Sequence, residues 1–486
     1  MNLESYFDSF RKNIIGIDFQ HAGNRIVYAD WTASGRLYRP IEEFITNQIG
    51  PLIANTHTEA SFTGCSMTHL YHEAQIRIKE HLNANEEDVL ICAGAGLTTV
   101  VNKFQRILGL KIPEKWADRV KIEEHEKPVV FITHMEHHSN QTTWEECAVT
   151  VIRVPEDEAG LPDARALDEL LKQYQDRPLR IGSFTACSNV TGINVDYRAL
   201  ARAMHENDGY CFIDFAAAAP YVDINMHPQD PLERLDAVMF SPHKFLGGPG
   251  SSGVLVFNRK LYNSEVPDHP GGGTVTWTNP WGKHHYFDDI EVREDGGTPG
   301  FLQTIRTALS IELKEQMGTE NMHKREQELV DILYQELSKI PKLEILHKQH
   351  KKRLCVISFY QPDIHFNLIV RLLSDRFGIQ TRGGCSCAGT YGHILLGVDE
   401  QTSHEITCQI DSGDLSQKPG WVRISMHPTA TDDEARYIAD AINQIVENIG
   451  EWELDYQFDA SAGDYLPKKE ESLVLSLSDF GKTPYS

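Results

Sequence analysis

Seven short apolar segments lie between residues 88 and 258, and stretches of helical length separate most of them. They read DVLICAG, PVVFITH, VTVIRVP, LRIGSFTAC, GYCFIDFA, DAVMFSP and SGVLVFN. Near-continuous apolar strands that alternate with helices are typical of a mainly parallel sheet covered by helices on both faces. We therefore predict an α/β fold with a mainly parallel seven-stranded sheet, whose functional residues gather at the carboxyl ends of the strands.

The pattern changes after residue 300. A helix is predicted over FLQTIRTALSIELKEQMG, then a strand pair KLEILHK and RLCVISFY, a polar helix from His365, a Gly/Cys-rich loop at 382–393, the strand GWVRISMHP and a last helix, TDDEARYIADAINQIVENIG. This order predicts a smaller α+β domain. We divide the chain into an N-terminal arm that joins the small domain (1–27), a large domain (28–300), the small domain with the Cys loop (301–455) and a mobile tail (456–486). Residues 401–420 are expected to form an insertion loop.

Composition narrows the class of protein. The 486 residues include 46 Lys+Arg and 70 Asp+Glu, which gives a formal net charge of −24. This balance argues against binding to nucleic acid or to an anionic membrane surface, both of which depend on clustered Lys and Arg. No apolar run approaches the length of about 18 residues that a membrane span needs. Nine cysteines are too sparse for a disulfide framework, so we expect a reduced, cytoplasmic location.

Two glycines stand at the start of a predicted helix, in GAGLTT at residues 94–99. The free N–H groups at a helix start attract phosphate, and Thr98 adds a hydroxyl donor. As a dinucleotide fingerprint the motif is incomplete, because Thr99 stands where the third glycine belongs, which disfavours a nicotinamide-dependent enzyme. Taken alone, the motif fits a phosphate site and an ordinary strand-to-helix turn equally well.

Two charged residues follow other predicted strands. Asp214 ends YCFID, where a buried carboxylate needs a partner such as the protonated ring nitrogen of a cofactor; the alternative is that it caps the next helix. Lys244 lies in FSPHKFLGG, where a desolvated amine would form a Schiff base with a carbonyl, unless it is an ordinary surface lysine. Ser241 and His243 flank it with donors suited to a phosphate and favour the first interpretation.

Histidines and an asparagine follow two further strands, in THMEHHSN and TACSNVTG. An imidazole such as that of His137 can stack on a flat heterocycle and shuttle protons, and Asn189 offers an amide at the next strand end. With His134, the adjacent His137 and His138 could indicate a metal site. Two neighbouring histidines of an extended chain cannot easily point at one ion, so we predict no metal.

The loop RGGCSCAGTYGH at 382–393 offers a candidate nucleophile. Glycines on both sides make the loop mobile, and the charge of Arg382 favours a thiolate at a nearby cysteine. Cys385 and Cys387 with His393 could instead form half of a zinc site, but no second pair follows at ligand spacing, and Cys408 alone is insufficient. Purely structural cysteines are the remaining alternative.

Together these motifs resemble the fold-type I pyridoxal phosphate (PLP) enzymes of the class V aminotransferase group, in particular the cysteine desulfurases and selenocysteine lyases. The matching segments follow in family order from residue 28 to 425: YADWTASG, GAGLTTVVN, MEHHSN, SNVTG, DFAAA, SPHKFLGG, GGGT, GGTPG, RGGCSC and VRIS. The resemblance implies a homodimeric PLP enzyme. It would remove sulfur from L-cysteine, or selenium from selenocysteine, and release alanine. A sulfur-acceptor protein is a candidate partner of such an enzyme.

Carried over position by position, the resemblance also implies roles for individual residues. Lys244 would hold PLP and later move a substrate proton, Asp214 would keep the pyridine nitrogen protonated, and His137 would stack on the ring. Arg423 would clamp the substrate carboxylate, and Cys387 would take the sulfur as a persulfide. The remaining implied contacts are Gly96, Thr98, Ser241 and His243 to the phosphate, Asn189 to the ring hydroxyl and the substrate, and Thr274 to the phosphate of a neighbouring subunit.

Departures from the family pattern keep other activities open. Ala217 stands where desulfurases usually carry a polar glutamine, and Leu97 replaces a second hydroxyl at the phosphate. The first difference removes a partner of the ring hydroxyl, so an aminotransferase, epimerase or β-lyase acting on another amino acid is the alternative. A catalytically silent sulfur-carrier scaffold is a third hypothesis. The insertion 401–420 is expected to reshape substrate access, and the role of Cys385 stays open between relay and spectator.

Overall fold

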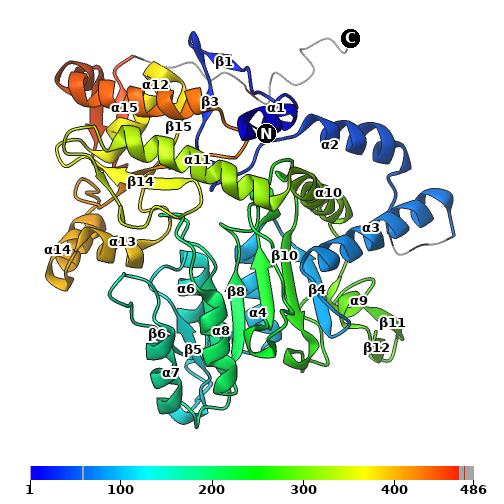
Figure 1. Cartoon of the computed structure of the whole chain (residues 1–486). Coiled ribbons are helices and arrows are strands. Elements are labelled where there is room, and N and C mark those ends of the chain that lie inside the picture. Colours follow the sequence, from blue (N-terminus) through cyan, green and yellow to red (C-terminus); the bar gives the residue numbers. More distant parts are fainter. Residues whose placement is uncertain (1, 57, 59, 470–475, 477–486) are drawn as a thin grey trace.

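The computed structural model describes residues 2–469 and 476, apart from 57 and 59, and places a small sheet above a large one (Figure 1). The large sheet has seven strands in the order β4-β10-β9-β8-β7-β5-β6. All neighbouring pairs are parallel except those made by β10, which runs antiparallel to β4 and β9. The strands are β4 (Asp88–Ala93), β5 (Val129–Ile132), β6 (Thr150–Arg153), β7 (Arg180–Thr185), β8 (Tyr210–Asp214), β9 (Ala237–Phe240) and β10 (Gly253–Asn258). The predicted mainly parallel seven-stranded sheet is confirmed.

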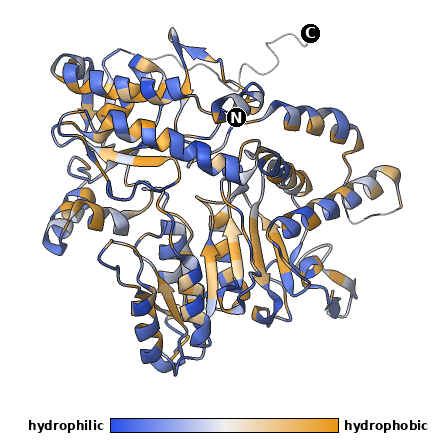
Figure 2. Ribbon diagram, in the orientation of Figure 1, coloured by the Kyte–Doolittle hydropathy of each residue, from blue (hydrophilic) through white to orange (hydrophobic). Residues whose placement is uncertain are grey.

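Both faces of this sheet are buried. Val129 and Phe131 of β5 join one core cluster, together with residues of α7 (Ala164–Gln173) and α8 (Tyr197–Glu206). Val130 and Ile132 point to the opposite face and join a second cluster, with α4 (Leu97–Ile107) and α6 (His138–Glu145). Figure 2 shows the apolar character of the central strands. Burial on both faces explains why these strands are near-continuous apolar runs rather than alternating ones.

Two long helices, α3 (Phe62–His81) and α10 (Phe301–Met317), lie side by side along the β4 side of the large sheet (Figure 1). Shorter elements complete this region: α2 (Arg39–Phe44), α5 (Glu114–Ala117), α9 (Ile290–Glu294), β11 (Val275–Thr278) and β12 (His284–Tyr286). Gly318, with a φ of 74°, ends α10 and lets the chain turn into the next helix.

The small sheet is antiparallel, in the order β13-β14-β17-β16. Three helices pack on it through a separate apolar core. The elements are β13 (Glu344–Ile345), β14 (Val356–Tyr360), β16 (Arg382–Gly384), β17 (Trp421–Ser425), α11 (Thr319–Leu337), α12 (Phe366–Phe377) and α15 (Asp432–Trp452). The predicted α+β pattern of strands and helices after residue 300 is thus present.

The start of the chain lies against this small unit. Strand β3 (Val27–Tyr28) pairs in parallel with β15 (Ile379–Gln380), and α1 (Leu3–Arg11) contacts α11. The Arg11 guanidinium forms an ion pair with Glu434 of α15 at 2.5 Å. Between α1 and β3, the strands β1 (Gln20–His21) and β2 (Asn24–Arg25) form a short hairpin.

One expectation about an irregular segment was wrong. Most of the expected insertion loop 401–420 is helical: α13 (Gly389–Leu396) is followed by α14 (Glu400–Asp411). The Asp399 carboxylate caps α14 by accepting the Thr402 N–H, a start signal that the sequence contains.

No helix among the described residues is long and apolar enough to cross a membrane.

The first part of the tail after residue 455 has regular secondary structure. Residues 456–467 form the hairpin β18 (Tyr456–Asp459) and β19 (Asp464–Pro467), which docks on α12. Asn367 Nδ2 donates to the Gly463 carbonyl at 2.7 Å, and Arg371 Nε donates to the Tyr465 carbonyl at 3.1 Å. The rings of His365, Phe458 and Tyr465 pack together, with centroid distances of 5.0 to 5.5 Å. Residues 470–475 and 477–486 lie outside the described part.

Candidate active site

One cavity of about 550 Å³ lies where the large sheet faces the small one. Every predicted site residue except Gly96 and Thr274 lines it. From the large sheet come Thr98, His137, Asn189, Asp214, Ser241, His243 and Lys244, and from the small unit come Cys387 and Arg423. Most of these side chains follow the carboxyl end of a strand, as the doubly wound topology dictates.

Neutral hydrogen-bond donors gather at one end of the cavity, where the N-termini of α4 and α6 meet. Ser241 Oγ accepts the Leu97 N–H at 2.8 Å, and the hydroxyls of Thr98 and Ser139 lie 2.6 Å apart. Gly96 lies directly behind: a Cβ there would stand only 3.1 Å from Ser241 Oγ, so a glycine permits this close approach. Two helix N-termini with three hydroxyls supply the N–H and O–H donors that suit a phosphate group. The sequence analysis did not single out Ser139.

The middle of the cavity holds a carboxylate, an amine and an imidazole. Burial raises the pKa of Asp214 to about 6, although its Oδ1 accepts the Ala216 N–H at 2.7 Å. Burial and, to a lesser extent, the charge of Arg423 lower the pKa of Lys244 to about 8, against the opposing effect of Asp214. Burial and the neighbouring Lys244 lower the pKa of His137 to about 4, so its ring is neutral at pH 7. A neutral ring can lie against a cofactor without adding charge.

The pKa of Lys244 gives a pH prediction. A protonated amine cannot attack an aldehyde, and the neutral fraction of Lys244 grows as pH rises through about 8. We expect the apo-protein to capture added PLP covalently with a rate that rises about tenfold per pH unit below pH 8 and levels off above it. Stopped-flow absorbance at a series of pH values measures this rate. A profile still rising steeply at pH 10 would contradict the lowered pKa.

An ion-pair network that the sequence analysis missed holds the predicted carboxylate clamp. Arg423 donates to Asp30 Oδ1 at 2.8 Å and to the Asn189 carbonyl at 3.0 Å, while its buried Nε has no partner within the described part of the chain. Arg382 Nε donates to the other oxygen of Asp30 at 3.0 Å. Asp30 therefore orients both guanidinium groups. Its position in the YADWTASG motif was the available signal.

The Cys loop crosses the cavity in a strained conformation. Ser386 and Cys387 have φ values of 52° and 55°, a left-handed region that non-glycine residues rarely adopt. Asn189 Nδ2 donates to the Ser386 carbonyl at 2.7 Å, and the His138 N–H donates to the Cys387 carbonyl at 2.8 Å. His138 Nε2 in turn accepts the Gly389 N–H at 3.0 Å. These contacts fix the backbone and leave the Cys387 side chain exposed, whereas Cys385 is half-buried.

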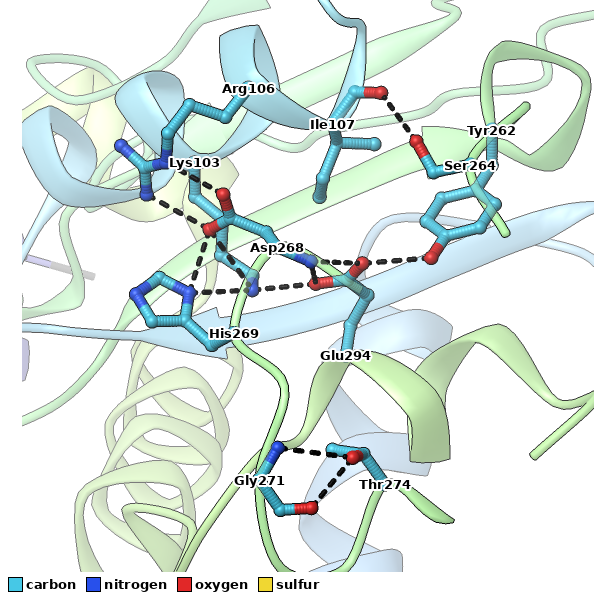
Figure 3. A network of polar contacts seen from close by, with 10 residues as sticks. All are labelled: Lys103, Arg106, Ile107, Tyr262, Ser264, Asp268, His269, Gly271, Thr274 and Glu294. Atoms are coloured by element: carbon cyan, nitrogen blue, oxygen red, sulfur yellow. Dashed lines mark hydrogen bonds and ion pairs between the residues drawn. The ribbon is translucent and has the colours of Figure 1, made fainter. Parts of the chain in front are cut away.

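Thr274 lies outside the cavity. Its hydroxyl donates to the Gly271 carbonyl at 2.7 Å and accepts the Gly271 N–H at 3.2 Å, and its side chain is buried within its own chain. A buried network holds the preceding loop against α4 (Figure 3). Lys103 Nζ lies 2.7 Å from Glu294 and 3.5 Å from Asp268. Helix α4, whose N-terminus lies at the cavity, therefore also holds the loop that precedes Thr274.

Replacing Lys103 tests the strength of this network. Lys103→Met leaves the nearly buried Glu294 and Asp268 carboxylates without their shared cation, which we expect to lower the free energy of unfolding by about 3 kcal/mol. Urea unfolding followed by circular dichroism measures the change. Arg106→Met, which removes a half-exposed partner of Asp268, is the matched control and should cost about 1 kcal/mol. Equal losses in both variants would contradict the buried network.

No group of three or more metal-ligating side chains is arranged to hold a metal among the residues that the structure describes. His134 instead lies under the α13 region, with Nε2 at 3.2 Å from the Gly160 carbonyl and its ring against Tyr391.

The cavity fits PLP on four counts. The hydroxyls and helix N-termini suit its phosphate, the buried Asp214 suits its protonated ring nitrogen, and the Lys244 amine suits its aldehyde. In addition, Asn189 lines the cavity, and its buried Oδ1 has no hydrogen-bond partner among the residues that the structure describes. Ala216 and Ala217 line the cavity with methyl groups. Position 217 thus offers no polar partner to the ring hydroxyl.

Comparison with known proteins gives the same family. The aminotransferase class-V family model matches residues 27–438. A probable cysteine desulfurase of Staphylococcus aureus is 27% identical over 376 residues, which cover 76% of this chain and 85% of the relative. A probable cysteine desulfurase of Streptomyces coelicolor is 27% identical over 389 residues, 78% of this chain and 88% of that protein.

Solved structures share the fold. The apo structure of a cysteine desulfurase from Thermococcus onnurineus superposes with a TM-score of 0.72 at 21% identity, covering 91% of this chain and 98% of that one. The cysteine desulfurase CsdA of Escherichia coli gives a TM-score of 0.70 at 20% identity, with the same coverage. With the family model matched across most of its length and the fold shared, the chain belongs to the class-V aminotransferase family.

Proposed function

We propose that this protein is a cysteine desulfurase that uses PLP to remove sulfur from L-cysteine, or selenium from selenocysteine, and releases alanine. The observation that carries the proposal is the position of Cys387. This exposed thiol lines the same cavity as Lys244 and Arg423, on a backbone held by Asn189 and His138. The probable cysteine desulfurases among its relatives support the same activity.

The family depends on PLP, and this chain is a PLP-dependent enzyme. When bound, PLP supplies an electron sink for the pair released at the substrate α-carbon. We assign Lys244 to anchoring it and to moving the α-proton, because its amine has a pKa near 8 and is available as a base. Asp214 would hold the proton of the ring nitrogen, and His137, which lines the same cavity, would stack on the ring.

Arg423 and Cys387 act on the substrate in this proposal. Arg423 binds the carboxylate, in a bidentate geometry that Asp30 preorients and that lysine cannot copy. The Cys387 thiolate attacks the substrate sulfur, a bond forms between the two sulfurs, and the bond between that sulfur and the substrate Cβ breaks. The electron pair of the broken bond stays with carbon and is protonated, so alanine leaves and Cys387 keeps a persulfide.

Product analysis tests the proposal. The PLP-loaded protein is incubated with L-cysteine and a reducing thiol, and alanine, sulfide, pyruvate and ammonia are measured. We expect alanine and sulfide in equal amounts. Pyruvate with ammonia would mean β-elimination, which needs no thiol nucleophile and is compatible with the apolar Ala217. Absence of all four products would overturn the proposal in favour of another amino-acid substrate.

We also propose that the protein works as a cytoplasmic homodimer whose Thr274 loop serves the neighbouring subunit. Large apolar side chains are exposed on α3 and at the β11–β12 hairpin: Phe62 (78%), Trp277 (50%) and Trp281 (83%). Exposed apolar surface of this kind supports a protein interface. The nine cysteines are all free thiols, which supports a reducing compartment. A sulfur-acceptor protein is a further expected partner.

A further inference from the structure

Two segments outside the core sheets build the outer rim of the cavity. Leu415 and Lys418, which follow α14, and Ala462 and Gly463, at the tip of the β18–β19 hairpin, all line it. The hairpin lies beyond residue 438, where the match to the family model ends. The rim therefore combines a segment inside the region matched by the family model with a hairpin that follows it.

The two segments are joined to each other. The Leu415 N–H donates to the Ala460 carbonyl at 2.8 Å, and the Lys418 N–H donates to the Leu415 carbonyl at 3.1 Å. Gly463, with a φ of 64°, packs so closely that a Cβ would lie 2.9 Å from Leu415 Cβ. The loop and the hairpin tip thus form one continuous rim, which Asn367 fixes to α12.

The rim presents one cation. Lys418 is exposed, lines the cavity, and has no ion-pair partner among the residues that the structure describes. Two residues after Lys418, a Cβ at Gly420 would lie only 2.9 Å from Gly384 Cα, and Trp421 pairs with Gly384 in the small sheet. Gly384 immediately precedes Cys385 of the Cys loop, so Lys418 stands on the Cys-loop side of the cavity. An unpaired lysine at this place is notable in a chain of net charge −24.

We infer that Lys418 recognises the anionic group of a small thiol that accepts sulfur from Cys387. The inference rests on the proposed function, which supplies the persulfide. The acceptor thiolate attacks the outer sulfur of that persulfide, the bond to Cys387 Sγ breaks, and the Cys387 thiolate leaves. The acceptor becomes a persulfide, and sulfur moves without any external oxidant or reductant.

The position of Lys418 favours the acceptor over the amino-acid substrate as its ligand. The carboxylate clamp Arg423 is almost fully buried, with 3% of its surface exposed, whereas Lys418 and Cys387 are both exposed. Lys418 and Cys387 are thus both open to a group that arrives from solvent after alanine has left. An exposed cation that lines the same cavity as the thiol attracts anionic thiols and repels cationic ones.

Three small thiols of different charge test this inference: 3-mercaptopropionate, 2-mercaptoethanol and cysteamine. The enzyme is first loaded with L-cysteine, and the persulfide on Cys387 is verified by mass spectrometry. The rate of persulfide loss is then measured against thiol concentration for the wild type and for Lys418→Glu. For each thiol, the rate of the variant is divided by the rate of the wild type, which cancels the intrinsic reactivity of that thiol.

In Lys418→Glu we expect the half-saturating concentration to rise roughly fivefold for 3-mercaptopropionate and to fall by a similar factor for cysteamine, with 2-mercaptoethanol unaffected. The shifts should shrink in 1 M salt, where the Debye length is about 3 Å. Lys121→Glu, an exposed lysine that does not line the cavity, makes the same change of charge and should show neither shift.

Two results count against the inference in different ways. Equal responses of all three thiols, or the same shifts in Lys121→Glu, would overturn the role of Lys418 while leaving the desulfurase intact. Failure of the wild type to form a persulfide on Cys387 would overturn the proposed function and this inference with it.

Discussion

Lys244→Ala is expected to lower alanine formation from L-cysteine by at least about 10²–10⁴-fold, the contribution of a positioned proton-transfer group. The variant loses both the amine that anchors PLP and the base with a pKa near 8. Borohydride reduction followed by peptide mass mapping should place the cofactor on Lys244 in the wild type and on no lysine in the variant. Added methylamine, which replaces the missing base, should restore part of the rate.

Lys314 provides an internal comparison for this experiment. Burial lowers its pKa to about 7, so reactivity by pKa alone would favour it over Lys244. Its Nζ bonds to the Val222 carbonyl and to His81, however, and it does not line the cavity. Cofactor trapped on Lys314 in active wild-type enzyme would contradict the assignment of Lys244.

Cys387→Ala is expected to lower sulfide and alanine release at least about a hundredfold while PLP stays bound, because the nucleophile is removed and the cofactor contacts remain. Alanine suits the test because position 387 keeps its left-handed backbone, which alanine adopts no worse than cysteine. Alanine and sulfide are quantified in single-turnover and steady-state assays, and the absorbance spectrum reports cofactor binding.

The control for Cys387→Ala is Cys408→Ala. Cys408 is an exposed thiol on α14, its Sγ lies 3.8 Å from His404 Nε2, and it does not line the cavity. This variant should release alanine at the wild-type rate. Undiminished sulfide release from Cys387→Ala would show that the thiol is not the nucleophile. Pyruvate in place of alanine from that variant would show that carbon–sulfur cleavage proceeds by elimination.

The prediction of the large sheet from sequence worked because all of its strands except the edge strand β6 are buried on both faces. Val129 to Ile132 all face apolar cores, so the strand is an unbroken apolar run that needs no tertiary information to recognise. The sequence did not predict α14 or the β18–β19 hairpin, for the opposite reason. Helix α14 has no fully buried residue, and β18–β19 is a short hairpin held by α12, so neither carries a strong hydrophobic pattern.

For the candidate site, the sequence supplied the chemistry of single residues at strand ends. Lys244, Asp214 and His137 were identifiable because reactive side chains there are costly to bury without a purpose. The roles of Asp30, Ser139 and Lys418 were not predicted, because each depends on groups that lie far away in the chain. Asp30 and Arg423, for instance, are 393 positions apart.

By itself, the sequence determined the α/β class, the seven strands and the set of groups able to hold a phosphorylated, electron-withdrawing cofactor, since apolar periodicity and residue chemistry are local properties. Only the tertiary structure decided which of these groups share one cavity, that Asp30 orients Arg423, that Thr274 bonds to Gly271 instead of lining its own chain's cavity, and that the C-terminal hairpin joins the rim. Those features depend on contacts between segments hundreds of residues apart, and such contacts are fixed by packing of the whole chain rather than by any local pattern.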